Sequence, residues 1–302
     1  MDLSYKDYTE RQRREVEADR LQERALTLRP SGNYKRAAND GPAAGQATDL
    51  PGGVGWVPQS YPGFAVISMV HENEDNNGLS AMLKAVQADL LEQCPWEESI
   101  YLLPSDSFHQ TVANNLSEER FIQRIQRPGL ETVYPGLVTQ AFTRLPSLPR
   151  RVLPMRLIGV GIFGTALGAL GIFDDEEAYN RILDFRSGFY ADPSLGALDV
   201  RMTRPFIGHI TLAYIESELD ALQRSTLAGV LSDINRRWPA GSRPTDRSDI
   251  NALRRFANFS QSESSAHIEK TQPAFNLSLT GLRRYHHLSA FHREEDYPRY
   301  HL

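Results

Sequence analysis

One short pattern occurs twice in this sequence, one hundred residues apart. Residues 108–112 read Phe-His-Gln-Thr-Val and residues 208–212 read Gly-His-Ile-Thr-Leu, so each contains His-x-Thr-aliphatic. Each copy lies on an extended apolar segment, where side chains alternate between the two faces of a strand. The histidine and the threonine of each copy therefore share one face. Two such strands side by side would form a phosphate site with an acid and a base from four side chains, His109, Thr111, His209 and Thr211.

The repetition favours a functional interpretation over a structural one. A single histidine on a strand is usually a structural residue, but the chain has only eight histidines, so two copies of this pattern are not expected by chance. Both copies also follow turn or glycine residues and precede a segment with helical periodicity. We therefore interpret the pair as one site.

Hydrophobic periodicity predicts alternating strands and helices from residue 61 onward. Strands are predicted at 64–70, 99–103, 108–112, 155–160, 170–173, 205–215 and 275–280. Helices are predicted at 79–94, 117–128, 174–189 and 216–238, with helical turns between 138 and 145. This order predicts an α+β fold with two lobes, β-α-β-β-α followed by β-β-α-β-α-β. The sheets are expected to be mostly antiparallel, and each lobe contributes one motif strand.

The first 55 residues differ in composition from the rest of the chain. Residues 1 to about 30 are dense in charges of both signs, and residues 31–55 are rich in Gly, Ala, Asn and Pro. We expect residues 1–55 to be a flexible N-terminal extension outside the fold, and residues 56–302 to form one bilobal domain. The polar segment 239–272 is expected to be a mobile insertion in that domain.

Composition limits the classes of partner. A net charge of −5 argues against capture of long nucleic acid, which needs many phosphate contacts from Lys and Arg, but allows a small or end-bound phosphate ligand. Cys94 is the only cysteine, so no intrachain disulfide can form. The uncharged run 157–173 is short for a membrane span and is interrupted by glycines, which favours two buried strands. We expect a cytoplasmic, monomeric protein without a membrane partner.

The motifs and their surroundings resemble the 2H phosphoesterase superfamily, which includes bacterial 2′,5′-RNA ligases and 2′,3′-cyclic phosphodiesterases. The resemblance lies in Tyr-Pro-Gly at 61–63, Tyr-Leu-Leu-Pro at 101–104, the first motif at 108–112, and the segment 206–214 around the second. It covers about residues 58–300 and is greatest to a bacterial sub-branch without an assigned function. It implies a bilobal fold with helices outside, two sheets flanking a central cleft, no metal, no cofactor, and both His-x-Thr pairs facing the substrate phosphate.

The residue types suit the hydrolysis of a cyclic phosphodiester. One group must take a proton from water and another must protonate the leaving ribose oxygen; histidine suits both because its pKa lies near neutrality. Threonine hydroxyls can donate hydrogen bonds to the phosphate oxygens. The expected substrate is a nucleotide or an RNA end, with His109 and His209 catalytic and Thr111 and Thr211 binding phosphate. Which histidine is the base stays open.

Two other functions fit the same residues. The site could belong to a nucleotide- or RNA-end-binding module without efficient turnover, or to an RNA 2′,5′-ligase that runs the reverse reaction. Two titratable groups favour the enzyme, because a binding module has no need of them.

Four other patterns are weaker. Residues 159–164 match the dinucleotide-binding pattern G-x-G-x-x-G, but no helix is predicted to start there. His287-Leu288-Ser289 is a third His-x-Ser/Thr, near the end of the chain, and is expected at a surface or at the rim of the site. The C-terminal histidines lack the spacing of a metal site, and Arg283, Arg284 and Tyr285 are equally compatible with a phosphate contact and with an exposed strand end.

Overall fold

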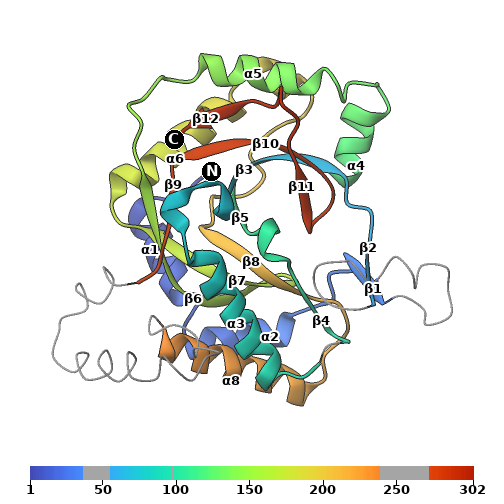
Figure 1. Ribbon diagram of the computed structural model, residues 1–302, viewed down its shortest axis with the longest axis vertical. Coiled ribbons are helices and arrows are strands. Elements are labelled where there is room, and N and C mark those ends of the chain that lie inside the picture. Colours follow the sequence, from blue (N-terminus) through green and yellow to red (C-terminus); the bar gives the residue numbers. More distant parts are fainter. Residues whose placement is uncertain (37–54, 97, 239–271) are drawn as a thin grey trace.

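The structure is a computed structural model that describes residues 1–36, 55–96, 98–238 and 272–302. In this part of the chain the strands form two five-stranded antiparallel sheets, one above the other in Figure 1, and a small ribbon. The β5 sheet has the order β11-β10-β3-β5, with β12 also paired to β10. The β8 sheet has the order β4-β8-β7-β6-β9. The α+β class and the antiparallel pairing expected from the sequence are confirmed.

The strands have the following bounds. The β5 sheet consists of β3 (Gly63–Met69), β5 (His109–Ser117), β10 (Leu279–His287), β11 (Ala290–His292) and β12 (Arg299–His301). The β8 sheet consists of β4 (Ile100–Leu102), β6 (Leu153–Phe163), β7 (Ala166–Phe173), β8 (His209–Ile215) and β9 (Ala274–Leu277). The ribbon pairs β1 (Tyr34–Arg36) with β2 (Trp56–Pro58).

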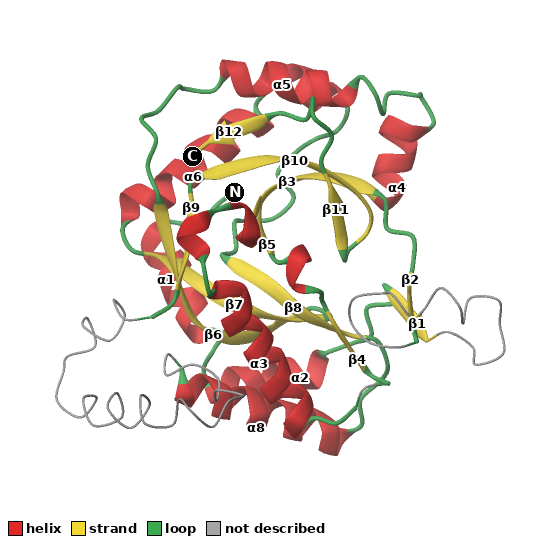
Figure 2. Ribbon diagram, in the orientation of Figure 1, coloured by secondary structure: helices red, strands yellow, loops and turns green. Residues whose placement is uncertain are grey.

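Helices cover the outer faces of both sheets (Figure 2). Those packed around the β8 sheet are α1 (Tyr5–Arg14), α2 (Ala18–Thr27), α3 (Leu79–Gln93) and α8 (Ala221–Arg237). Those around the β5 sheet are α4 (Glu118–Phe121), which continues as a π-helical turn (Ile122–Gln126), α5 (Tyr134–Arg144), α6 (Glu176–Tyr190) and the short α7 (Pro193–Ala197). Helix α6 contacts strands of both sheets, because it also packs on β6 and β7.

The chain crosses between the two sheets more often than the sequence order predicts. Strand β4 precedes β5 in sequence but pairs with β8, and the last strands β10, β11 and β12 return to the β5 sheet. The division into a first and a second half is therefore wrong, although each sheet does contain one motif strand. The predicted strand 275–280 is in fact two strands, β9 and β10, which belong to different sheets.

The N-terminal residues are part of the fold, contrary to the expectation of a flexible extension over residues 1–55. Helix α1 packs beside β7, with Tyr8 buried and stacked on Tyr179 at a ring-centroid distance of 4.4 Å. The Tyr8 hydroxyl donates to the carbonyl of Gly171, and Gln12 Nε2 donates to the carbonyls of Gly171 and Gly208. Helix α1 thereby holds the residue directly before the second motif histidine. Residues 37–54 of the expected extension lie outside the described residues.

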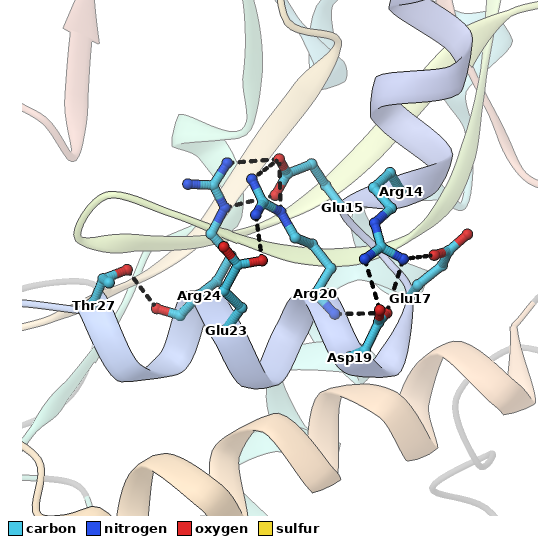
Figure 3. A network of polar contacts seen from close by, with 8 residues as sticks. All are labelled: Arg14, Glu15, Glu17, Asp19, Arg20, Glu23, Arg24 and Thr27. Carbon is cyan, nitrogen blue, oxygen red and sulfur yellow. Dashed lines mark hydrogen bonds and ion pairs between the residues drawn. The ribbon is translucent and has the colours of Figure 1, made fainter.

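The dense charges of this segment pair with one another, as Figure 3 shows. At the α1–α2 junction the Glu15 carboxylate accepts hydrogen bonds from Arg20 and Arg24, while Arg14 contacts Asp19 and Glu17. Hydrogen bonds from Arg24 and Arg20 keep the pKa of Glu15 below its usual value, although burial acts to raise it. The charged face is thus neutralised locally and the opposite face is free to pack, which composition alone does not reveal.

Two other expectations concern the long uncharged run and the insertion. Residues 157–173 form most of the β6–β7 hairpin, as predicted, with the turn at Gly164. In the described part of the chain no helix has both the length and the apolar character needed to cross a membrane. The expected insertion at 239–272 lies outside the described residues except for its last position.

Candidate active site

A buried glutamine joins the two motif strands. Gln110 lies between His109 and Thr111 in the sequence, points to the opposite face of β5 and is fully buried. Its Oε1 accepts a hydrogen bond from the backbone N–H of His209 at 2.7 Å, and its Nε2 donates to the carbonyl of Ile207 at 3.1 Å. A side chain of the first motif therefore forms hydrogen bonds with backbone groups of the second motif at and just before His209. These bonds hold the two His-x-Thr segments side by side.

Both strands carry a β-bulge at the same position of the motif. On β5 the pairing with β3 shifts between Thr111 and Ala113, and on β8 the pairing with β7 shifts between Thr211 and Ala213. The extra residue is the aliphatic one that follows each threonine. A bulge changes the face of every later residue in the strand. As a result the half-buried face that carries each histidine and threonine also carries the third residue beyond the threonine, Asn114 on β5 and Tyr214 on β8.

The two histidines have matching environments. His109 Nδ1 lies 2.7 Å from the carbonyl oxygen of Ser107, and His209 Nδ1 lies 3.0 Å from that of Ile207. A carbonyl oxygen only accepts, so Nδ1 carries the hydrogen in both neutral rings and Nε2 presents its lone pair. Each imidazole also has an aromatic neighbour, listed by distance between ring centroids: Phe291 at 4.3 Å from His109 and Phe163 at 4.8 Å from His209.

Burial lowers the pKa of both imidazoles. The pKa of His109 falls to about 4, with the hydrogen bond to Ser107 opposing the shift. The pKa of His209 also falls to about 4, mainly through burial and further through the charges of Arg204 and His109. With these pKa values both rings are neutral at pH 7, so each Nε2 can accept a proton.

These lowered pKa values predict acid destabilisation. In the unfolded chain a histidine titrates near 6.5, whereas in the fold His109 and His209 titrate near 4. Between these pH values the unfolded state binds more protons, so stability is full above about pH 6.5 and falls as the pH is lowered toward 4. Urea denaturation of the wild type and of the double variant His109→Asn/His209→Asn at pH 7 and pH 4.5 measures this. The variant should lose less stability on acidification; an equal loss in both proteins would contradict the account.

The two motif threonines complete the half-buried site. Neither the Thr111 nor the Thr211 hydroxyl has a hydrogen-bond partner within the described ranges, and the same holds for both histidine Nε2 atoms. Buried polar atoms normally form hydrogen bonds with protein groups or with water. Two hydroxyl donors and two imidazole nitrogens are therefore available to a ligand on this face.

A glycine in each sheet gives an aromatic ring room beside the site. A Cβ at Gly168, which pairs with Thr211, would lie 2.6 Å from Phe163 Cζ and 2.6 Å from the carbonyl oxygen of Ile210. A Cβ at Gly63 would lie 2.6 Å from the Tyr285 hydroxyl. The ring of Phe163 thus lies across Gly168 to reach His209. The ring of Tyr285 lies across Gly63, the glycine of the Tyr-Pro-Gly segment.

Gly168→Ala should destabilise the protein and displace Phe163 from His209. The new methyl group meets backbone as well as the ring, so the neighbours cannot simply rotate away, and overpacking of this kind costs roughly 1–3 kcal/mol. Gly136→Ala is the matched control, because Gly136 lies in α5 and has nothing within 4 Å of its Cβ position. Thermal denaturation should show a lower midpoint for Gly168→Ala alone. Equal midpoints for the two variants would show that the close approach is unimportant.

Comparison with known proteins adds little to this geometry. No protein-family model matches the chain, and no curated protein matches it. A solved structure of a conserved protein of unknown function from Agrobacterium tumefaciens strain C58 is similar, with 16% sequence identity and a TM-score of 0.47, over 78% of this chain and 86% of that chain. A likeness this distant carries no conclusion about chemistry, which rests on the residues of the site itself.

The other sequence candidates lie in different places. His287 is at the end of β10, where its Nδ1 is 2.9 Å from Ser289 Oγ, and the β10–β11 hairpin brings Phe291 rather than His287 against His109. Arg283 is buried in an ion pair with Glu72. The G-x-G-x-x-G segment lies within β6 and its turn, not at the start of a helix, so the dinucleotide pattern is excluded there.

Two further candidates are also accounted for. Arg284 forms an ion pair with Glu131. Over the described residues, no group of three or more His, Cys, Asp or Glu side chains could hold a metal ion.

Sequence reasoning missed several residues of the site: Gln110, Asn114, Phe163, Arg204, Tyr214 and Phe291. The sequence did contain one sign that the two motif strands are alike beyond the threonines. Both motifs continue with alanine, as Thr-Val-Ala at 111–113 and Thr-Leu-Ala at 211–213. This longer repeat predicts that the two strands have similar local structure after the threonine, although it does not predict that this structure is a β-bulge.

Proposed function

We propose that this protein is a metal-independent phosphodiesterase of the 2H type that hydrolyses the 2′,3′-cyclic phosphate of a nucleotide or an RNA end. The observation that carries the proposal is the matched pair of histidines, each fixed through Nδ1 to a backbone carbonyl and joined by Gln110. Fixing Nδ1 holds the ring and leaves Nε2 for proton transfer, which is the arrangement that general acid–base catalysis requires.

In the proposed reaction one neutral histidine takes a proton from water as the water oxygen bonds to phosphorus. The other histidine, protonated, gives its proton to the ribose oxygen as the bond from phosphorus to that oxygen breaks. A bound phosphate carries negative charge, which favours the protonated form of a nearby imidazole and so offsets the effect of burial. Thr111 and Thr211 donate hydrogen bonds to the non-bridging oxygens, whose charge increases in the transition state. His109 and His209 can exchange the two roles according to the orientation of the substrate.

A binding module and an RNA 2′,5′-ligase remain the alternative functions. Incubation of the protein in EDTA with cyclic mononucleotides and with oligonucleotides that end in a cyclic phosphate separates the three, with products resolved by chromatography. The proposal expects a phosphomonoester product. Saturable binding without product would favour the binding module, joined oligonucleotides would favour the ligase, and a strict need for added divalent metal would refute the mechanism.

A further inference from the structure

The face that carries the two His-x-Thr pairs continues beyond them to a second polar group, centred on Arg204. In the amide orientation that satisfies both side chains, the Asn114 oxygen accepts hydrogen bonds from Arg204 Nη2 at 2.8 Å and Nε at 2.9 Å. The backbone beneath is also fixed, because the carbonyl of Arg204 accepts from Arg186 Nη2 at 3.0 Å. Arg186 is itself buried in an ion pair with Asp2. An exposed arginine is rarely held at both its backbone and its guanidinium.

The bulges explain why this group faces the same way as the histidines. Without the extra residue after Thr111, Asn114 would point into the core; with it, Asn114 shares the face of His109. Asn114 lies three positions after Thr111, which is roughly 7–10 Å along a strand. That distance is close to the separation of neighbouring phosphates along a nucleotide chain.

Within the described ranges, the guanidinium of Arg204 forms no ion pair with a carboxylate, so its charge is not neutralised there. A guanidinium has five N–H donors. Two are used by Asn114, so three remain, and two of these can bind one phosphate in the paired geometry that arginine favours.

A tyrosine hydroxyl lies further along the same face. Tyr214 is half-buried on the face of β8 that carries His209 and Thr211, and burial raises the pKa of its phenol, so the phenol keeps its hydrogen and can donate it. Arg204 lies five residues before His209, on the segment that leads into β8, and its guanidinium contacts Asn114 on β5, so it connects the two motif strands. One positive charge and one neutral donor form a site for a second anion.

We infer that Arg204, held by Asn114, binds a second phosphate of the substrate, one nucleotide unit away from the phosphate that is cleaved. The inference rests on the proposed function and narrows its substrate class. The preferred substrate is then a cyclic phosphate that carries a further phosphate, as the 3′ end of an oligonucleotide does, rather than a cyclic mononucleotide.

The test compares adenosine 2′,3′-cyclic phosphate with the same nucleotide carrying an additional 5′-phosphate. For each, kcat/KM is measured in EDTA and the dissociation constant by calorimetry, with the wild type, Arg204→Gln and Arg201→Gln. Arg201 is the matched control, because it lies three residues away, is exposed and is paired with Asp199. Loss of Arg204 also changes the pKa of His209, but this affects both nucleotides equally and cancels in their ratio.

The wild type and Arg201→Gln should prefer the 5′-phosphorylated nucleotide about tenfold or more, as expected for charge-assisted hydrogen bonds, and Arg204→Gln should lose that preference. Arg204→Lys should recover only part of it, because lysine lacks the fork that binds Asn114. An absence of preference in the wild type, or equal behaviour of the two Gln variants, overturns the inference. If neither nucleotide is hydrolysed, the proposed function fails, and the role of Arg204 is then judged from the ratio of the two dissociation constants. If neither nucleotide binds, the inference about Arg204 is overturned as well.

Discussion

His109→Asn and His209→Asn should each lower kcat/KM for a 2′,3′-cyclic phosphate roughly 10²–10⁴-fold, the usual contribution of a general acid or base. Asparagine is the informative replacement, because its amide can keep the donor to the carbonyl of Ser107 or Ile207 while the titratable Nε2 is lost. The measurement is initial rates in EDTA, with folding checked by circular dichroism.

The control for this pair is His301→Asn, since His301 is exposed on β12, away from the motif strands. Its rate should equal that of the wild type. Wild-type turnover in both motif variants would show that the imidazoles are structural, and loss in only one of them would remove the two-histidine mechanism.

Gln110→Leu should have the largest effect on stability, although it changes neither histidine nor threonine. Leucine fills a similar volume, but the backbone N–H of His209 would lose its buried partner, and the carbonyl of Ile207 would keep only the hydrogen bond from His209 Nδ1. The unsatisfied N–H costs about 1–3 kcal/mol and the second lost hydrogen bond about 1 kcal/mol, so the free energy of unfolding should fall by roughly 2–4 kcal/mol. Because the motif strands are no longer joined, kcat/KM should fall as well. Urea denaturation and initial rates measure the two effects.

Gln123→Leu is the control, because Gln123 is in the helical segment after β5, where its amide donates to Glu119 on the exposed surface. It should leave stability and rate near those of the wild type. Gln110→Glu adds a sharper test, since its carboxylate can accept from His209 but cannot donate to Ile207. A stability of Gln110→Leu equal to that of the wild type would mean that the strands are held together by packing alone.

Much of the fold follows from local patterns in the sequence. The apolar runs at β3 and β7 and the helical periodicity of α3, α6 and α8 placed these elements correctly within a few residues. Helix α8 begins with a capping box formed by Asp220 and Gln223, which sets its start later than the periodicity indicated. The local patterns did not predict which strand belongs to which sheet. The pairing of β4 with β8 and the return of β10 to β3 depend on contacts far apart in the sequence.

The N-terminal helices were missed for a related reason. Their apolar surface is narrow and much of their attachment is polar, through Gln12 and through Asp2, which accepts from the backbone N–H of Phe206 and from Arg186. Hydrogen bonds to a distant backbone leave no periodic trace in a sequence, whereas a wide apolar stripe does. The dense charges were visible, but their mutual pairing was not.

For the candidate site, the sequence predicted the four motif residues but not how they are arranged in space. The repeat identified the four motif side chains, and the structure places both copies side by side through Gln110. The sequence could not show that Gln110 joins them, since any residue between His and Thr points to the far face. Arg204 lies five residues before His209 in a segment without regular structure, so no periodicity relates it to Asn114.

Hydrolysis of adenosine 2′,3′-cyclic phosphate in water enriched in ¹⁸O, with EDTA present, tests whether water attacks phosphorus without a metal and with the help of both histidines. Mass spectrometry of the product reports where the oxygen from water enters, and the same reaction is run with His109→Asn and His209→Asn. The two-histidine mechanism predicts one labelled oxygen on phosphorus with the wild type and little product with either variant. Label in the ribose, turnover only with added metal, or equal product from the variants would contradict it.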